Sequence, residues 1–295
     1  MPDRPDRTRK PEPMPYPQQP QDPQQPSPPG GHQPPSLWTD RGRPWIVGLI
    51  FLLLSGNFFF QIQVYLLGAG LVLPVLAGQM LGVFIPLLII FRRNGWDPVR
   101  DLKLGPVPWP MMIVPALLAV AALVPTSLLV ELSMRLFPGD PERIAMFQEA
   151  LPRSPLGILL TVITVVLVGP LSEEIVFRGL LHRLASGYWG PLQAGLLSSL
   201  VFALVHAEPW LLLGLVGVGA ALAFLFEASG SLLVCFIFHA GHNALALTLM
   251  YLSDEIRTEP QPIEAMDWVW LGISLLAWGV LAHRLLVGRR RRGDC

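Results

Sequence analysis

The chain has 295 residues, of which 52% are hydrophobic and 14% are charged, and its mean hydropathy is +0.50. Soluble globular domains carry about 25% charged residues, so this composition excludes an ordinary soluble single-domain enzyme. The formal net charge of zero argues against a nucleic-acid partner. The two cysteines, Cys235 in an apolar run and Cys295 at the end, exclude a disulfide-rich scaffold.

The N-terminal stretch is rich in proline and poor in apolar side chains. Residues 1–36 contain 13 prolines and six glutamines. Proline disfavours helix, and so few apolar groups cannot offset the entropy cost of ordering. We predict that residues 1–40 form a disordered cytoplasmic tail, a solvated tether or alternatively a docking arm for proline-recognising domains. No small-residue cleavage site follows the first apolar run near Trp45, which argues against a signal peptide.

The rest of the chain is dominated by apolar runs of about 20 residues, the length that crosses a bilayer. Good runs of this kind lie at 45–67, 71–91, 111–134, 231–252 and 268–287. The stretch 156–185 is longer and contains charged residues, and 191–227 divides into two short helices at Glu208-Pro209. The sequence therefore predicts an all-α, polytopic membrane helix bundle with about eight transmembrane helices.

Charge in the loops predicts the orientation, because basic residues favour the cytoplasmic side. Arg41 and Arg43 precede the first span, and the arginine run 289–292 follows the last. The loop 253–267 carries five acidic residues and one arginine, which suits the outside. We expect an N-in and C-in domain over 41–288, a basic cytoplasmic tail over 289–295, and a bacterial cytoplasmic membrane as its location. In the neutral loop before the fourth span, residues 138–150 fit a short interfacial helix, with Asp140 as cap and Pro141 in the first turn.

Charged groups in the fourth span are functional candidates, because charges at bilayer depth are costly. Glu174 and Arg178 are four residues apart, so they share one helix face and can pair. Glu173 points about 100° away from Glu174. A buried ion pair explains one glutamate structurally, but the second glutamate fits a general base that faces a cavity.

Histidine and asparagine occur in later spans. His206 ends the fifth span, and a lone histidine on an apolar face is most often a core residue. His239 and Asn243 are four apart on one face, so both can donate hydrogen bonds to one small target, as oxyanion stabilisers do. His242 fits a helix–helix hydrogen bond. The glycines at 214, 217 and 219 fit close helix packing, not a nucleotide loop.

Three short motifs occur in order on successive membrane segments: E-E-x-x-x-R at 173–178, F-x-x-x-H at 202–206 and H-x-x-x-N at 239–243. Together they resemble the CPBP family, which groups CAAX prenyl endopeptidases with bacterial Abi and bacteriocin-processing membrane proteins. The resemblance covers residues 155–250. It implies an intramembrane endopeptidase in which Glu173 activates water with His206 as partner. It also implies that His239 and Asn243 bind the oxyanion, while Glu174 and Arg178 support the site.

The implied reaction is hydrolysis of a peptide bond near the membrane without a covalent intermediate, and no cofactor is required. An alternative is a zinc-dependent protease with Glu173, His206 and His239 as ligands. The substrate would be a peptide or membrane protein from the lipid bilayer, and prenylated substrates are implied by the family alone. Other classes that stay open are a non-catalytic immunity or scaffold protein and a proton-coupled transporter. Glu173 and His206 can meet only if the fourth helix continues to about residue 185.

Overall fold

The structure is a computed structural model that describes residues 35–39, 43–253 and 259–293. Most of the predicted N-terminal tail, residues 1–34, lies outside this described part. The described residues contain helices and no strand, which confirms the predicted all-α class. Seven helices are long and apolar enough to cross a membrane, and α10 (Pro191–Val205) is apolar but shorter. The eight predicted spans therefore correspond to seven long helices and α10, and the N-in and C-in orientation stays a prediction.

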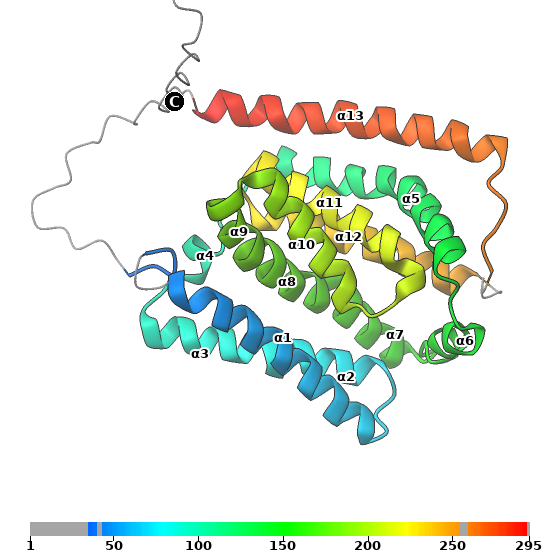
Figure 1. The fold of residues 1–295 in the computed structure, drawn as a ribbon, viewed down its shortest axis with the longest axis horizontal. Coiled ribbons are helices and arrows are strands. Elements are labelled where there is room, and N and C mark those ends of the chain that lie inside the picture. The colour runs from blue at the N-terminus through cyan, green and yellow to red at the C-terminus, as the bar shows by residue number, and fades with distance from the viewer. Residues whose placement is uncertain (1–34, 40–42, 254–258, 294–295) are drawn as a thin grey trace, which may run out of the picture. The chain divides into compact units, whose positions relative to one another are not determined.

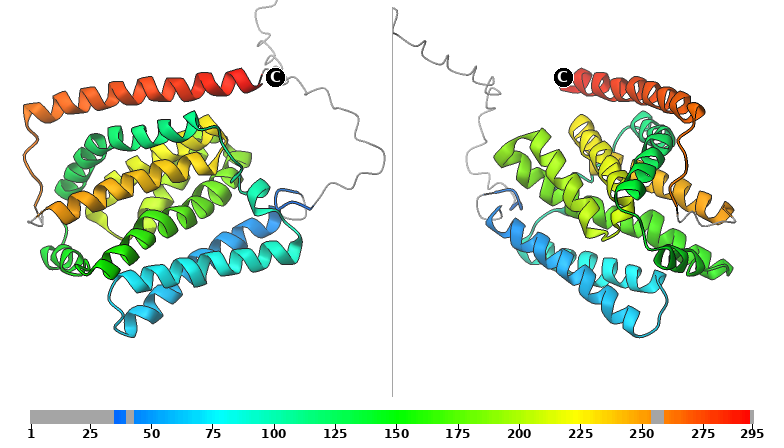
Figure 2. Two further views of the ribbon diagram at one scale, coloured as in Figure 1. Left: turned by 180° about the vertical axis from the view of Figure 1, so that it is seen from behind. Right: turned by 45° about the vertical axis from the view of Figure 1, so that its right-hand side comes forward.

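The first two long helices form an antiparallel hairpin, drawn in blue and cyan in Figure 1 and from behind in Figure 2. They are α1 (Arg43–Leu66) and a continuous helix made of α2 (Val72–Ala77), η1 (Gly78–Phe84) and α3 (Ile85–Asn94). The backbones approach closely at Gly82, where a Cβ atom would lie 2.3 Å from the backbone nitrogen of Asn57. A side chain at position 82 would therefore separate the two helices.

Residues 35–39 attach the beginning of the described chain to α4 (Pro98–Asp101). Asp101 accepts hydrogen bonds from the Ser36 hydroxyl at 2.8 Å and the Leu37 N–H at 3.2 Å. The indole of Trp38 donates to the backbone oxygen of Asp101, and the guanidinium of Arg183 lies 3.9 Å from the Trp38 ring centroid. Residues 35–39, which the sequence places in the disordered tail, are therefore folded against the membrane domain.

The third long helix is α5 (Pro110–Leu136), and α6 (Pro141–Glu149) follows it across a short linker. The Asp140 carboxylate accepts a hydrogen bond from the Glu142 N–H at 3.0 Å, and Pro141 is the first residue of α6. This arrangement confirms the short helix, the cap and the first-turn proline that the sequence predicts.

The fourth long helix is continuous from Pro155 to Trp189, and it carries the first motif. Its parts are α7 (Pro155–Val162), η2 (Ile163–Val168), α8 (Gly169–Glu174), η3 (Ile175–His182) and α9 (Arg183–Trp189). The segments η1, η2 and η3 are π-helical, and η1 and η2 each end two residues before a proline, Pro86 and Pro170. Widened turns of this kind accommodate the missing N–H of proline, and they are frequent at functional sites. The helix extends past residue 185, as the convergence of Glu173 and His206 requires.

The remaining helices complete the domain, and α13 lies along its outside (Figure 1). After α10 come η4 (Pro209–Leu211), α11 (Leu212–Ser229), α12 (Leu232–Leu252) and α13 (Ala265–Gly293). The predicted break at Glu208-Pro209 is confirmed by the turn between α10 and η4. The predicted glycine packing is confirmed too, since a Cβ at Gly219 would lie 2.8 Å from the Cβ of Ser199. The helix α13 continues through the terminal arginine run to Gly293.

Candidate active site

An ion pair between Glu174 and Arg178 lies at the centre of the helices. The pair is predicted by the i, i+4 spacing and confirmed by an N–O distance of 3.0 Å, with both side chains fully buried. Arg178 also donates to the backbone oxygen of Gly219 at 2.9 Å, and its guanidinium lies 5.0 Å from the Phe202 ring centroid. Buried charges are stable only when they are paired and hydrogen-bonded, and these contacts pair Arg178 and bond its two terminal nitrogens.

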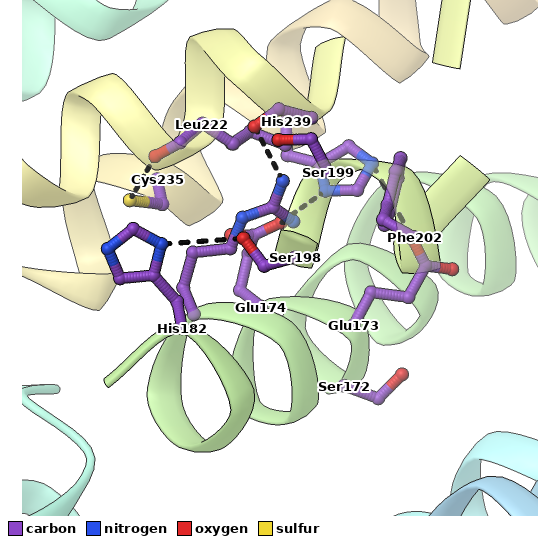
Figure 3. Close-up of polar contacts among 12 residues, drawn as sticks. Ser172, Glu173, Glu174, His182, Ser198, Ser199, Phe202, Leu222, Cys235 and His239 are labelled. Atoms are coloured by element: carbon purple, nitrogen blue, oxygen red, sulfur yellow. Dashed lines mark hydrogen bonds and ion pairs between the residues drawn. The ribbon is translucent and has the colours of Figure 1, made fainter. Parts of the chain in front are cut away.

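The ring of His239 lies between the two glutamates of the first motif (Figure 3). Its Nδ1 atom is 2.8 Å from Oε1 of Glu174, and its Nε2 atom is 3.7 Å from Oε2 of Glu173. A carboxylate only accepts hydrogen bonds, so Nδ1 carries the hydrogen that it donates to Glu174. Glu174 therefore fixes the orientation of the imidazole and directs Nε2 toward Glu173.

Glu173 is the more accessible of the two glutamates. Its side chain is 22% exposed, whereas that of Glu174 is 0% exposed, because neighbouring helix positions point in directions about 100° apart. The gap of 3.7 Å to His239 is too long for a direct hydrogen bond. One water oxygen about 2.8 Å from each group would fit both, because water can donate a hydrogen bond to the carboxylate and also bond the ring nitrogen.

Asn243 is held by a carbonyl that the π-helical segment η2 leaves free. The Gly169 N–H donates to the oxygen of Thr164, and Pro170 has no N–H, so the helix supplies no partner for the Val165 carbonyl from either residue. The side-chain nitrogen of Asn243 donates to that oxygen at 3.0 Å. An amide nitrogen has two hydrogens, so one remains for a ligand. The expected common face of His239 and Asn243 on α12 thus faces the helix of the first motif.

His206 lies in the same region, beside the Phe202 ring. Its Nδ1 atom is 2.7 Å from the backbone oxygen of Phe202, and its ring centroid is 4.7 Å from that of Phe202. Because a carbonyl only accepts, Nδ1 carries the hydrogen, and Nε2 is the nitrogen left for another group. Within the described residues, no hydrogen bond or ion pair joins His206 to Glu173. The Phe202 ring contacts both histidines, since its centroid lies 5.7 Å from that of His239.

One contact at the site, between Ser172 and Gln79, could not be predicted from the sequence. The hydroxyl of Ser172 hydrogen-bonds the side-chain oxygen of Gln79, which is buried in η1, and lies 2.8 Å from the backbone oxygen of Gly169. This contact brings the second long helix to the residue that precedes Glu173. A single glutamine in an apolar span predicts no partner, so only the tertiary structure could reveal this pair.

His242 lies outside this cluster. Its Nε2 atom is 3.1 Å from the hydroxyl of Thr126 on α5, which confirms the predicted helix–helix hydrogen bond. Thr126 also donates to the backbone oxygen of Ala122 at 2.7 Å. The two histidines of α12 therefore have different surroundings, and of the two it is His239 that lies beside Glu173 and Glu174.

The three residues of the alternative zinc site do not lie close enough together to bind one metal ion. Across 35–39, 43–253 and 259–293, no group of three His, Cys, Asp or Glu side chains has the arrangement of a metal site. Glu173 and His239 are close to each other, but His206 interacts with the Phe202 carbonyl on its own helix. The set Glu173, His206 and His239 therefore does not fit zinc in this conformation.

The fold and the site define a polytopic helical membrane protein with paired carboxylates and a histidine at its buried centre. Residues 155–245 match the Rce1-like family, whose description is type II CAAX prenyl endopeptidase Rce1-like. This match confirms the resemblance to CPBP family intramembrane proteases, and the family implies a protease and hydrolase in a multi-pass membrane protein. The matched segment contains all three motifs and leaves α1 to α6 outside. No curated protein and no solved structure matches the chain.

Proposed function

We propose that this protein is a glutamate-dependent intramembrane endopeptidase that hydrolyses a peptide bond near the membrane. The observation that carries the proposal is the position of His239, bonded to the buried Glu174 on one side and 3.7 Å from the accessible Glu173 on the other. That arrangement places a carboxylate base and a histidine nitrogen, which donates when the ring is an imidazolium, on the two sides of one small space. No cofactor is required by the proposed reaction.

In the proposed reaction, Glu173 takes a proton from a water molecule. The resulting hydroxide attacks the carbonyl carbon of the scissile bond and forms a tetrahedral oxyanion. When the C–N bond breaks, the departing amine receives the proton from the Glu173 carboxyl group. The products are a free carboxyl end and a free amino end, and Glu173 returns to its starting state.

His239 and Asn243 would stabilise the oxyanion. Asn243 retains one amide hydrogen after bonding Val165, and His239 donates from Nε2 when it is an imidazolium. In that form His239 and Arg178 balance the charges of Glu173 and Glu174, as a buried site requires. Removal of one such donor costs about 3 to 4 kcal/mol of transition-state stabilisation in comparable sites.

His206 would act on the water or the departing amine through its Nε2 atom. The hydrogen bond from Nδ1 to the Phe202 carbonyl supports this role, because it leaves Nε2 free for substrate or water. Since no hydrogen bond or ion pair joins His206 to Glu173 in the described residues, the two would act on the same substrate from different positions. Glu174 and Arg178 would support the site by orienting His239.

The proposed substrate is a peptide or membrane protein that enters from the lipid bilayer of a bacterial cytoplasmic membrane. The family description names CAAX prenyl endopeptidases, so a prenylated CAAX-type peptide is the first probe to use. An unprenylated peptide library is the second probe. The comparison of the two separates recognition of the lipid group from recognition of the peptide alone.

The test is cleavage of both probes by detergent-purified protein, with wild type beside Glu173→Gln. We expect cleavage by wild type and loss of cleavage in Glu173→Gln at an unchanged unfolding temperature. Glu142→Gln is a matched control, because Glu142 is an exposed carboxylate on α6. Equal cleavage by Glu173→Gln would contradict the proposal.

A chelator arm separates the glutamate mechanism from a zinc mechanism. Cleavage that survives a strong chelator supports glutamate-activated water. Cleavage that is lost with chelator and restored by zinc would overturn it in favour of a metalloprotease. If the folded wild-type protein cleaves neither probe, that result favours the non-catalytic scaffold protein.

A further inference from the structure

The turn that carries His206 has a strained backbone. Residues 206–208 join α10 to η4, and Ala207 has φ of +55°. This left-handed conformation is uncommon for a residue with a side chain, and it persists when surrounding contacts impose it. The turn therefore depends on residues from other elements for its shape.

The main polar contact to this turn comes from α6, outside the segment that matches the Rce1-like family. Arg143 of α6 forms an ion pair with Glu208 at 2.8 Å. The Glu208 side chain is 12% exposed, and its second oxygen is buried with no hydrogen-bond partner among the described residues. Arg143 thus supplies a counter-charge to this largely buried carboxylate.

Apolar packing places α6 over the same turn. The guanidinium of Arg143 lies 5.4 Å from the centroid of the buried Trp210 ring. A Cβ on Gly139, in the linker before α6, would lie 2.6 Å from Ile144 and 3.0 Å from Trp210. The absence of a side chain at Gly139 therefore allows α6 to pack against the residues that follow the turn.

The far side of the turn is held independently by α5. The hydroxyl of Ser133 donates to the backbone oxygen of Pro209 at 2.9 Å and accepts from the Leu213 N–H at 3.3 Å. The near side, with His206, has no such contact to another helix, since the one hydrogen bond of its ring in the described structure goes to Phe202 on α10 itself. The His206 N–H also donates to the Ala203 oxygen at 3.3 Å, so His206 lies where α10 ends and the turn begins, directly before the strained Ala207 and one residue from Glu208.

We propose that Arg143 and Glu208 are positioning residues, and that α6 holds His206 in its working position through this ion pair. The inference rests on the proposed function of His206. Without Arg143, the largely buried Glu208 carboxylate would lose its ion pair, so the turn would open to hydrate it. Ala207 would then relax from its strained conformation, and His206, its direct neighbour, would move away from the substrate.

The kinetic test compares Arg143→Gln, Arg143→Lys and wild type on the prenylated CAAX-type peptide. We expect Arg143→Gln to lower kcat by roughly 10- to 100-fold, the scale of a small misplacement of a catalytic group. Arg143→Lys keeps the positive charge and should restore most of the rate. Gly139→Ala displaces α6 without changing charge and should reproduce the loss, while Glu142→Gln on the same helix should not. An unchanged kcat in Arg143→Gln, or a change in KM alone, would overturn the inference.

A second measurement needs no substrate. In protein labelled with 15N-histidine, the His206 ring signals, assigned with His206→Gln, should show hydrogen on Nδ1 in wild type. Arg143→Gln should shift these signals toward a mixture of ring forms and leave those of His242 unchanged. Identical His206 signals in wild type and Arg143→Gln would overturn the proposal even if no peptide is cleaved. Failure of both probes in wild type, with the expected change in signals, would instead contradict the proposed function.

Discussion

Glu174 and His239 are 65 residues apart in the chain, and their side chains share a buried hydrogen bond of 2.8 Å. The bond joins α8 to α12 and leaves the second ring nitrogen of His239 facing Glu173. Two adjacent glutamates therefore have different tasks, because one orients the imidazole and the other remains accessible.

This difference predicts that the same substitution changes the stability of the fold at one position and not at the other. Glu174→Gln should destabilise the fold by about 3 to 5 kcal/mol, because it leaves Arg178 buried without its counter-charge. Glu173→Gln should leave stability nearly unchanged, since this side chain is partly exposed and has no ion pair shorter than the 3.7 Å contact to His239. Thermal unfolding of both variants in detergent checks the prediction. Equal destabilisation by the two substitutions would contradict it.

Asn243 and His242 are neighbours on α12 with different predicted effects. Asn243→Ala should lower kcat by about 100- to 1,000-fold, the range measured when an oxyanion donor is removed. His242→Gln should reduce stability by about 1 kcal/mol through the lost Thr126 hydrogen bond, with kcat nearly unchanged. Steady-state kinetics on the cleaved peptide distinguishes the two. A large loss of kcat in His242→Gln would mean that the roles have been assigned to the wrong residue.

Gln79 should affect the reaction although it lies outside the matched segment. Gln79→Leu removes the contact to Ser172 and should lower kcat by about tenfold, equivalent to about 1.4 kcal/mol. Ser172→Ala should give a similar loss, and the double variant should lose little more, because both changes break the same contact. The rates of the three variants form a double-mutant cycle. Additive losses would show that Gln79 and Ser172 act independently.

The buried Asp101 carboxylate should make the stability of the folded protein depend on pH. Burial raises the pKa of the Asp101 carboxyl, but hydrogen bonds from Arg100, Ser36 and the Leu37 N–H outweigh it, so its net pKa is below the usual 3.8. A lowered pKa in the folded state contributes stability above pH 3.8, and this contribution is lost as pH falls through the folded value. The unfolding temperatures of wild type and Asp101→Asn should therefore differ above about pH 5 and converge in stronger acid. A difference that does not change with pH would contradict this account.

The sequence predicts those parts of the site that depend on helix periodicity. Spacing alone places Glu174 beside Arg178 and puts His239 and Asn243 on one face. The apolar residues of the fourth run permit the helix to continue to about residue 185, which the convergence of Glu173 and His206 requires. Contacts between distant elements follow no local pattern. Gln79 and Ser172 are 93 residues apart, and Arg143 and Glu208 are 65 apart.

The expected direct partnership of His206 with Glu173 depends on a turn whose shape comes from tertiary contacts. The contacts of residues 35–39 with the membrane domain could not be predicted either, because the composition of these residues resembles that of the tail before them. Local sequence therefore predicts the helices and the faces that they present, but not the side chains that each face meets.

The contact between Asn243 and Val165 has a consequence for how two membrane helices recognise each other. In hydrocarbon, no water can donate a hydrogen bond to the Val165 carbonyl. Because Pro170 has no N–H, a neighbouring helix must supply the donor. A shift of α12 by one residue would move Asn243 by about 1.5 Å along its axis and 100° around it. The absence of an N–H at Pro170 thus helps to fix how α12 aligns with the fourth long helix. The same alignment places His239 beside both glutamates.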